Sequence, residues 1–427
     1  MKPFFSAEYF FLTAICAAIV AGCSIAGPSP DKPAPASGRE LVLGAIEPKK
    51  EDSGFMKSGL ISTALSSSDF RAAEPLKRLD PHSGHDGKPF SLTLKDGTRV
   101  GGLLFPFPAA GDEPMPLLIA GFGFLQDRWG SEAAKFYGLY LKDSANRLPA
   151  HVLFLDHPSA GPFLAENGCL SMGSYDDARM WIEVAQHLEE RMQLSSIHLL
   201  GVSMSGQTVV HALIEDKRLG LDLFDSGIAV SIAPDFKKAP GKQLAYLKTS
   251  GGMKNPWRHD LEPLPRMGLT DTIQGAALGL LIEKQFVQHY RLIRPSDAAF
   301  ELKADQAAVF LRNAFEARIT MLRQQKEKTW NKEIDLTDLD AFMTSSRIAD
   351  FIGRVRTPLL LVSALDDPAV ERSLFAEVAK AAEGNTWVVA YETDHGGHFG
   401  FDMVYGPDYL ERVIRLMMTP AVIVNWL

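Results

Sequence analysis

The stretch 197–206, which reads IHLLGVSMSG, decides the fold. It begins as a short run of mostly apolar residues of strand type, Gly201 and Gly206 then bracket a serine, and a segment of helical spacing starts at Gln207. Strand, tight turn with a central serine and helix are the parts of a nucleophile elbow, which exposes a serine hydroxyl above a sheet. Because a helix could also simply begin after Ser203, the assignment depends on finding chemical partners elsewhere in the chain.

Short apolar runs alternate with helical segments on both sides of this stretch. Runs of strand type lie at 117–120, 152–155, 227–232, 358–362 and 386–391, and helical spacing is found at 175–192, 207–214, 371–382 and 407–418. An Asp-Gly pair at 96–97 joins two further runs, 90–94 and 100–105, and predicts a hairpin. The alternation predicts an α/β fold with a largely parallel central sheet flanked by helices.

Residues 236–345 interrupt this alternation. They contain no convincing strand, but 302–322 has the spacing of a long amphipathic helix, and 273–282 is apolar on nearly every side. We interpret this region as a helical lid inserted into one domain whose core comprises 86–235 and 346–427.

A serine nucleophile needs an imidazole as its base, and the imidazole needs a carboxylate to fix its tautomer. In an α/β-hydrolase the acid and then the histidine follow the serine, each at the end of a later strand. The last two predicted strands are followed by Asp366 and Asp367 and by His395 and His398, respectively. Both predicted places are therefore occupied, which turns Ser203 into a candidate nucleophile.

One residue of each pair fits better. Asp367 matches the carboxylate of the pattern small-x-x-Asp-x-x-Val, whereas Asp366 is predicted to be a turn residue that bonds nearby backbone. His398 lies among glycines that permit a tight loop toward the serine, whereas His395 is predicted to be a loop histidine close to the site. The predicted catalytic residues are Ser203, His398 and Asp367.

The oxyanion that forms during acyl transfer needs two fixed N–H donors. We predict the backbone N–H of Met204, which follows the nucleophile, and that of Phe122, in the loop after the strand at 117–120. The alternative is that the glycines around Phe122 only make a tight turn. Further candidates to line the pocket lie at or just after strand ends, and a plain loop role is the alternative for His157: Gly121, Gly123, His157 and His395.

The motifs GVSMSG at 201–206, ALDDP at 364–368 and GGHFGF at 396–401 resemble the α/β-hydrolase superfamily. The run 345–368 and the Gly-Phe end of the histidine loop are similar to the YheT-like branch of predicted esterases. The resemblance implies an α/β-hydrolase fold, esterase activity and no cofactor. Two residues depart from the pattern, since Ala120 stands where many relatives have histidine and Ser205 where glycine is usual.

The N-terminus resembles a bacterial lipoprotein signal. An apolar run at 9–20 is too short to span a bilayer, and VAGC at 20–23 predicts cleavage after residue 22 and acylation of Cys23. A Pro/Ala-rich tether over 23–40 and an extension of uncertain structure over 41–85 would follow. We expect a lipid-anchored protein of the bacterial cell envelope, with a secreted or periplasmic protein as the alternative.

Composition restricts the classes of function. The 427 residues carry a net charge of −8 with both signs interspersed, which argues against nucleic acid as a partner. Three cysteines and no CxxC spacing leave no disulfide framework and no metal site to propose. We expect a small-molecule ester as substrate. The alternatives are amidase, peptidase or acyltransferase chemistry on the same fold, or a catalytically silent lipoprotein that binds a ligand. The sequence leaves the oligomeric state open.

Overall fold

The computed structural model describes residues 37–47, 85–108, 113–124, 126–143, 147–238, 304–325, 330–367, 369–398, 400–406 and 408–427. All of them belong to one compact unit, Ser37–Leu427. The predicted signal peptide, Cys23 and the apolar segment 273–282 lie outside the described residues. Within the described residues, no helix combines the length and the apolar character needed to cross a membrane.

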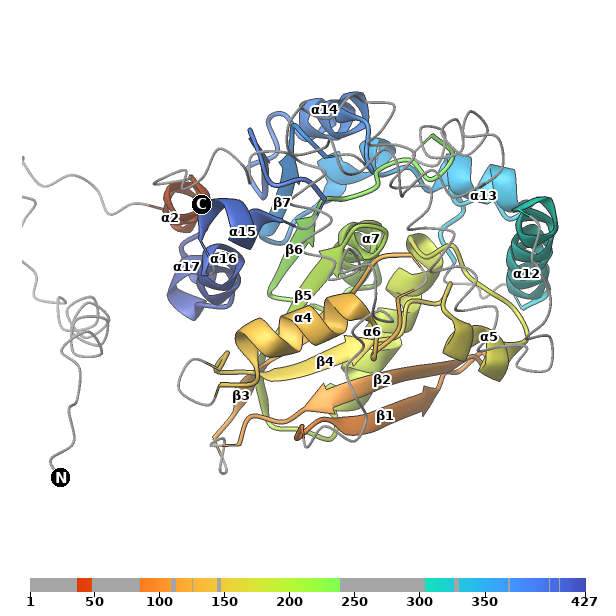
Figure 1. Cartoon of the computed structure of the whole chain (residues 1–427), viewed down its shortest axis with the longest axis horizontal. Helices are drawn as coiled ribbons and strands as arrows, with labels where there is room; N and C mark the ends of the chain where they lie inside the picture. Colours follow the sequence, from red (N-terminus) through yellow and green to blue (C-terminus); the bar gives the residue numbers. More distant parts are fainter. Residues whose placement is uncertain are drawn as a thin grey trace, which may run out of the picture. The chain divides into compact units, whose positions relative to one another are not determined.

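An eight-stranded sheet forms the centre of this unit, in the order β1-β2-β4-β3-β5-β6-β7-β8 (Figure 1). The strands are β1 (Lys88–Thr93), β2 (Arg99–Phe105), β3 (Met115–Gly121), β4 (His151–Leu155), β5 (Leu194–Val202), β6 (Ser226–Val230), β7 (Leu359–Ala364) and β8 (Val388–Thr393). Strand β2 pairs antiparallel with β1 and β4, and all other pairs are parallel. The predicted hairpin and the largely parallel α/β sheet are confirmed.

Helices cover both faces of the sheet, so its central strands are apolar on both sides. Alternate residues of β3 show this, because Leu117 and Ile119 join one apolar core while Leu118 and Ala120 join the other. The first core includes residues of α6 (Tyr175–Glu189), α7 (Ser205–Leu219), α12 (Ala304–Gln324) and α14 (Arg372–Ala381). The second includes residues of α2 (Gly38–Ile46), α4 (Ser131–Tyr140), α15 (Phe401–Tyr405), α16 (Tyr409–Met417) and α17 (Pro420–Val424).

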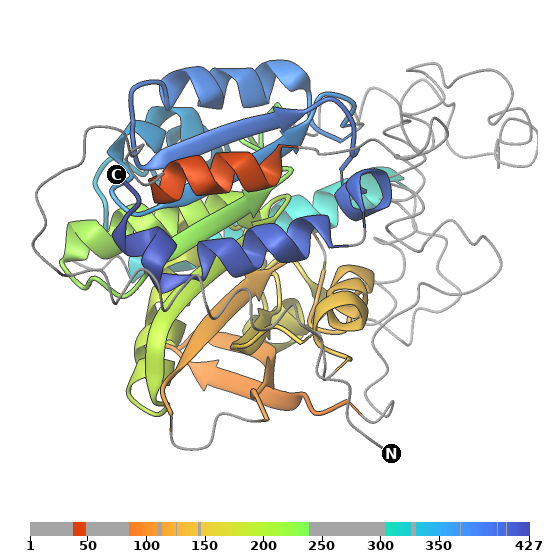
Figure 2. The same ribbon diagram turned by 90° about the vertical axis from the view of Figure 1, so that its left-hand side faces the viewer.

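Helix α2 was not predicted. The hydroxyl of Ser37 accepts the N–H of Glu40 while the Glu40 carboxylate accepts the N–H of Ser37, a capping box that starts the helix. Val42 and Ile46 are buried, and α2 packs against α16 and α17 (Figure 2). The predicted end of the tether at residue 40 is therefore wrong, since the chain is already helical and docked on its own C-terminal helices from Gly38.

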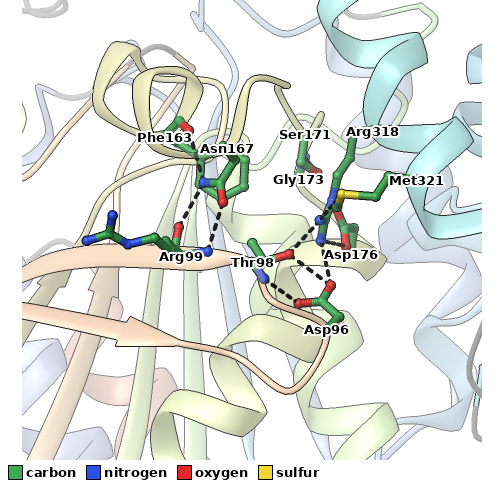
Figure 3. A network of polar contacts seen from close by, with 10 residues as sticks. All are labelled: Asp96, Thr98, Arg99, Phe163, Asn167, Ser171, Gly173, Asp176, Arg318 and Met321. Carbon is green, nitrogen blue, oxygen red and sulfur yellow. Dashed lines mark hydrogen bonds and ion pairs between the residues drawn. The ribbon is translucent and has the colours of Figure 1, made fainter. Parts of the chain in front are cut away.

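Helix α12 is the amphipathic helix predicted at 302–322, and it is held to the core by a buried arginine (Figure 3). The side chain of Arg318 is 2% exposed, and its Nε and Nη2 donate to the two carboxylate oxygens of Asp176 at 2.8 Å each. Its Nη1 donates to Thr98 Oγ1, in the β1–β2 turn, at 2.7 Å. Burial acts to lower the pKa of Arg318, but Asp176 and Asp96 outweigh it and raise that pKa, so the guanidinium stays charged.

The two ends of the inserted region lie side by side. Asp235, which follows β6, and Arg347, which precedes β7, are 3.1 Å apart between Oδ2 and Nε, and the N–H of Ile348 donates to the carbonyl of Pro234 at 3.4 Å. Strands β6 and β7 pair directly with each other. The insertion therefore leaves and rejoins the core at one place, which we call the neck (Pro234, Asp235, Arg347 and Ile348). Its predicted role as a lid stays a prediction, because 239–303 lie outside the described residues.

Candidate active site

The predicted elbow is present between β5 and α7. Ser203 has φ +58°, a conformation that non-glycine residues rarely adopt. A Cβ added to Gly201 would lie 2.2 Å from the carbonyl oxygen of Ser205, and one on Gly206 would lie 3.1 Å from Ile232 Cγ1. The backbone contact excludes a side chain at Gly201, and a side chain at Gly206 would be tight against Ile232.

Gly201→Ala is expected to lower the free energy of unfolding by about 1–3 kcal/mol, because the clashing atom belongs to the backbone of the elbow and cannot move aside. Gly138→Ala is the matched control, since a Cβ at that position of α4 meets nothing within 4 Å. It should raise the free energy of unfolding by about 0.5–1 kcal/mol through helix propensity. Urea unfolding of both variants checks this, and equal stability of Gly201→Ala and the wild type would contradict it.

The structure brings Ser203, His398 and Asp367 together from the ends of β5, β8 and β7. His398 Nε2 lies 2.9 Å from Ser203 Oγ, and His398 Nδ1 lies 2.7 Å from Asp367 Oδ2. The other oxygen of Asp367 accepts the N–H groups of Ala369 and Val370 at 2.7 and 3.1 Å. Because an ionised carboxylate only accepts, Nδ1 of His398 must carry the proton, which leaves the Nε2 lone pair facing the serine hydroxyl.

The second Asp–His pair lies beside this relay. Asp366 Oδ1 accepts the N–H of Gly397 at 2.8 Å, and its Oδ2 is 3.5 Å from Nδ1 of the half-buried His395. Burial raises the pKa of the Asp366 carboxyl. Asp366 thus bonds backbone as predicted, and it holds the loop immediately before His398. Pro368 and Phe399, which belong to the predicted motifs, lie outside the described residues.

The loop after β3 passes directly beside the nucleophile. A Cβ on Gly121 would lie 2.4 Å from Trp181 Cζ2, so close approach disfavours a side chain there. One on Gly123 would lie 3.3 Å from Ser203 Cβ, which is a tight contact. The N–H of Gly123 donates to Glu132 Oε2 at 2.9 Å. Within the described part of the chain, the N–H groups of Phe122 and Met204 have no hydrogen-bond acceptor, which leaves these two amides as candidate oxyanion donors.

His157 does not reach the triad. It is 2% exposed, its Nδ1 lies 2.7 Å from Ser159 Oγ, and its Nε2 faces Asp177 at 4.0 Å. Burial lowers the pKa of His157 to about 3, so the ring is neutral. Its side chain therefore turns into the interior, and its predicted place in the pocket stays a prediction.

Sequence reasoning missed an apolar cluster next to the elbow. Its buried members are Ala233, Phe236, Ala369, Val370 and Leu374, and Met172, Met204 and Met343 pack against them. The N–H of Ala233 donates to the carbonyl of Ser203 at 3.4 Å, and Ala369 and Val370 bond Asp367. We call these eight residues the Met cluster. They come from segments far apart in the sequence, so no local pattern could have assembled them.

The described residues offer no group of three or more His, Cys, Asp or Glu side chains that could hold a metal ion. Cys169 is buried, and burial raises the pKa of its thiol.

Several solved structures are similar to this chain at low sequence identity. Among curated proteins none matches the chain. An esterase of Pyrococcus furiosus is similar in structure at 13% identity, covering 78% of this chain and 90% of that one with a TM-score of 0.46. Brefeldin A esterase, a bacterial homologue of human hormone-sensitive lipase, is similar at 16% identity, covering 91% and 93% with a TM-score of 0.43. Acylaminoacyl peptidase of Pyrococcus horikoshii is similar at 12% identity, covering 78% and 40% with a TM-score of 0.39.

The family comparison spans most of the sheet and both segments of the core. Residues 117–409, from β3 to the start of α16, match the alpha/beta hydrolase family. The match includes the elbow, the acid loop and the histidine loop. The chain belongs to the alpha/beta hydrolase family.

Proposed function

We propose that this protein is a serine hydrolase that cleaves carboxylic esters through an acyl-enzyme. The observation that carries the proposal is the continuous relay from Ser203 Oγ through His398 to Asp367, with contacts of 2.9 and 2.7 Å. The order and geometry of these groups are those of nucleophilic catalysis by an activated serine.

In the first half of the reaction Ser203 Oγ forms a bond to the ester carbonyl carbon, and its proton passes to His398 Nε2. The carbonyl oxygen becomes an oxyanion that the N–H groups of Phe122 and Met204 stabilise. Collapse breaks the bond to the alcohol oxygen, which takes the proton from Nε2 and leaves. Water then repeats the sequence on the acyl-enzyme and releases the acid, which restores the serine hydroxyl.

The Met cluster supports an apolar group on the substrate. Met172, Met204 and Met343 are partly exposed beside a buried apolar patch that touches both the nucleophile and the acid loop. Methionine side chains are unbranched and flexible, so they accommodate chains of different shape. We therefore propose an acyl chain or another apolar group as the part of the ester that binds there.

Two finer assignments belong to the same proposal. The runs 345–368 and 396–401 support a place in the YheT-like branch of the family, and VAGC at 20–23 supports lipid anchoring at Cys23 in the bacterial cell envelope. Both rest on the sequence motifs alone.

A fluorophosphonate probe tests the proposed chemistry, because it reacts with a serine only when a neighbouring base activates it. The wild type should be labelled and should hydrolyse p-nitrophenyl esters, while Ser203→Ala should lose the label and about 10⁴-fold or more of the turnover. Ser91→Ala, an exposed position of β1, is the matched control and should behave as the wild type.

Two results would speak against this assignment. Labelling that persists in Ser203→Ala would remove Ser203 as the nucleophile. Faster cleavage of aminoacyl anilides than of any p-nitrophenyl ester would replace the esterase by an amidase. A series of esters from acetate to palmitate measures the preference for apolar chains in the same assay.

A further inference from the structure

The peptide group that joins Phe122 to Gly123 is held at both ends. Its carbonyl oxygen accepts a hydrogen bond from the hydroxyl of Ser205, at the start of α7. Its N–H donates to Oε2 of Glu132, in the first turn of α4, at 2.9 Å. Ser205 is 1% exposed, so its hydroxyl bond is shielded from water. Two elements on different faces of the sheet thus fix one peptide plane beside the nucleophile.

We propose that Ser205 and Glu132 are positioning residues that aim the Phe122 N–H at the oxyanion. The inference rests on the proposed ester hydrolysis and names the residues that prepare its oxyanion site. Neither side chain needs to touch the substrate. Each acts by orienting backbone that does.

The loop needs such support because glycines flank Phe122. Gly121 and Gly123 restrict the backbone less than other residues, so an unsupported loop would sample several orientations of the intervening amides. The ring of Phe122 is anchored in the core against Phe136 and Phe154, with centroids 6.3 and 5.2 Å away. With the ring and the following peptide plane both fixed, the preceding N–H has little freedom left. A preorganised donor of this kind stabilises charge in the transition state without reorganising.

The bond between Gly123 and Glu132 also decides which amide faces the oxyanion. Because the N–H of Gly123 is already donated to a carboxylate, it does not compete for the substrate oxygen. The Phe122 N–H remains, together with that of Met204. The residue that departs from the family pattern, Ser205 in place of glycine, supplies the hydroxyl that completes this arrangement.

The charge of Glu132 separates a positioning role from a purely electrostatic one. The Cβ position of Gly123 is 3.3 Å both from Glu132 Oε1 and from Ser203 Cβ, so the carboxylate borders the site where the oxyanion forms. Lys135, one turn later on α4, interacts electrostatically with Glu132. If Glu132 acted only through its negative charge, removing that charge would ease oxyanion formation and raise kcat. If it positions the peptide, any side chain that keeps an acceptor oxygen should preserve kcat.

The test compares Ser205→Ala, Glu132→Ala and Glu132→Gln in the full chain. Ser205→Ala and Glu132→Ala are each expected to lower kcat by about 10- to 100-fold, with KM nearly unchanged. A trifluoromethyl ketone inhibitor, which forms an oxyanion on the serine, should lose affinity by the same factor. Glu132→Gln should stay within about threefold of the wild type in both measurements. Glu189→Ala, an exposed position at the end of α6, is the control.

Three results would overturn the proposal. They are unchanged kcat in both alanine variants, loss of kcat without loss of inhibitor affinity, and equal losses in Glu132→Gln and Glu132→Ala. Glu132 is half-buried near a helix start, so its variants keep the test decisive if Ser205→Ala does not fold. A wild type that neither turns over esters nor reacts with fluorophosphonate is a different result. It overturns the proposed function and this inference with it.

Discussion

Asp367→Asn is expected to lower kcat for ester hydrolysis about 10⁴-fold while the protein stays folded. The reason lies in the second oxygen of the carboxylate, which accepts the N–H groups of Ala369 and Val370. An asparagine must keep its carbonyl oxygen there and turn its NH₂ group toward His398 Nδ1. The imidazole then carries its proton on Nε2, and it can no longer accept the proton of Ser203.

The neighbouring Asp366→Asn is the matched control for this variant. Its Oδ1 accepts the N–H of Gly397, and the carbonyl oxygen of asparagine can do the same. We expect kcat to fall by less than about tenfold, because only the attraction to His395 is lost. Steady-state kinetics and circular dichroism on both variants make the comparison. A larger loss of kcat in Asp366→Asn than in Asp367→Asn would reverse the assignment of the acid.

Arg318→Met is expected to lower the free energy of unfolding by about 3–5 kcal/mol. The substitution leaves the Asp176 carboxylate in the interior without its bidentate partner, and a buried charge that loses its partner is costly. It also removes the bond to Thr98, which connects α12 to the β1–β2 turn. Urea unfolding at neutral pH measures the loss.

Two further variants test the cause. Arg312→Ala removes a guanidinium from the same helix whose side chain is 60% exposed, and an exposed ion pair should cost no more than about 1 kcal/mol. The double variant Arg318→Met, Asp176→Leu should be more stable than Arg318→Met alone, because no buried charge is then left unpaired. Equal losses for Arg312→Ala and Arg318→Met would show that burial of the pair is not what matters.

Local sequence patterns predicted most of the strands and helices and the loops in which the candidate site residues lie. Alternating apolar runs predicted the strands, and the residues that follow them in the order serine, acid, histidine predicted which loops meet. This works because parallel strands that are paired in register bring their carboxyl ends to one edge of the sheet. The structure places His398 between Ser203 and Asp367. It places Asp366 against the N–H of Gly397 and near His395.

Local sequence patterns could not predict contacts between segments that lie far apart in the chain. Arg318 and Asp176 are 142 residues apart, and nothing in either local sequence marks them as partners. Glu132 reads as an ordinary acidic residue in the first turn of a helix, yet it bonds the loop beside the nucleophile. Helix α2 is short and its capping box lies in a polar region, so only its packing against α16 and α17 sets it apart.

The neck gives the fold a modular character. Strands β6 and β7 are neighbours, so the chain inserted between Asp235 and Arg347 leaves the core and rejoins it at the same place. The Asp235–Arg347 ion pair joins the two ends of this insertion. The entropic cost of holding the ends of such an insertion together rises by only about 0.6 kcal/mol for each doubling of its length. Evolution could lengthen, shorten or exchange the insertion without changing the register between β6 and β7. The catalytic core and the insertion are therefore free to diversify in sequence at different rates.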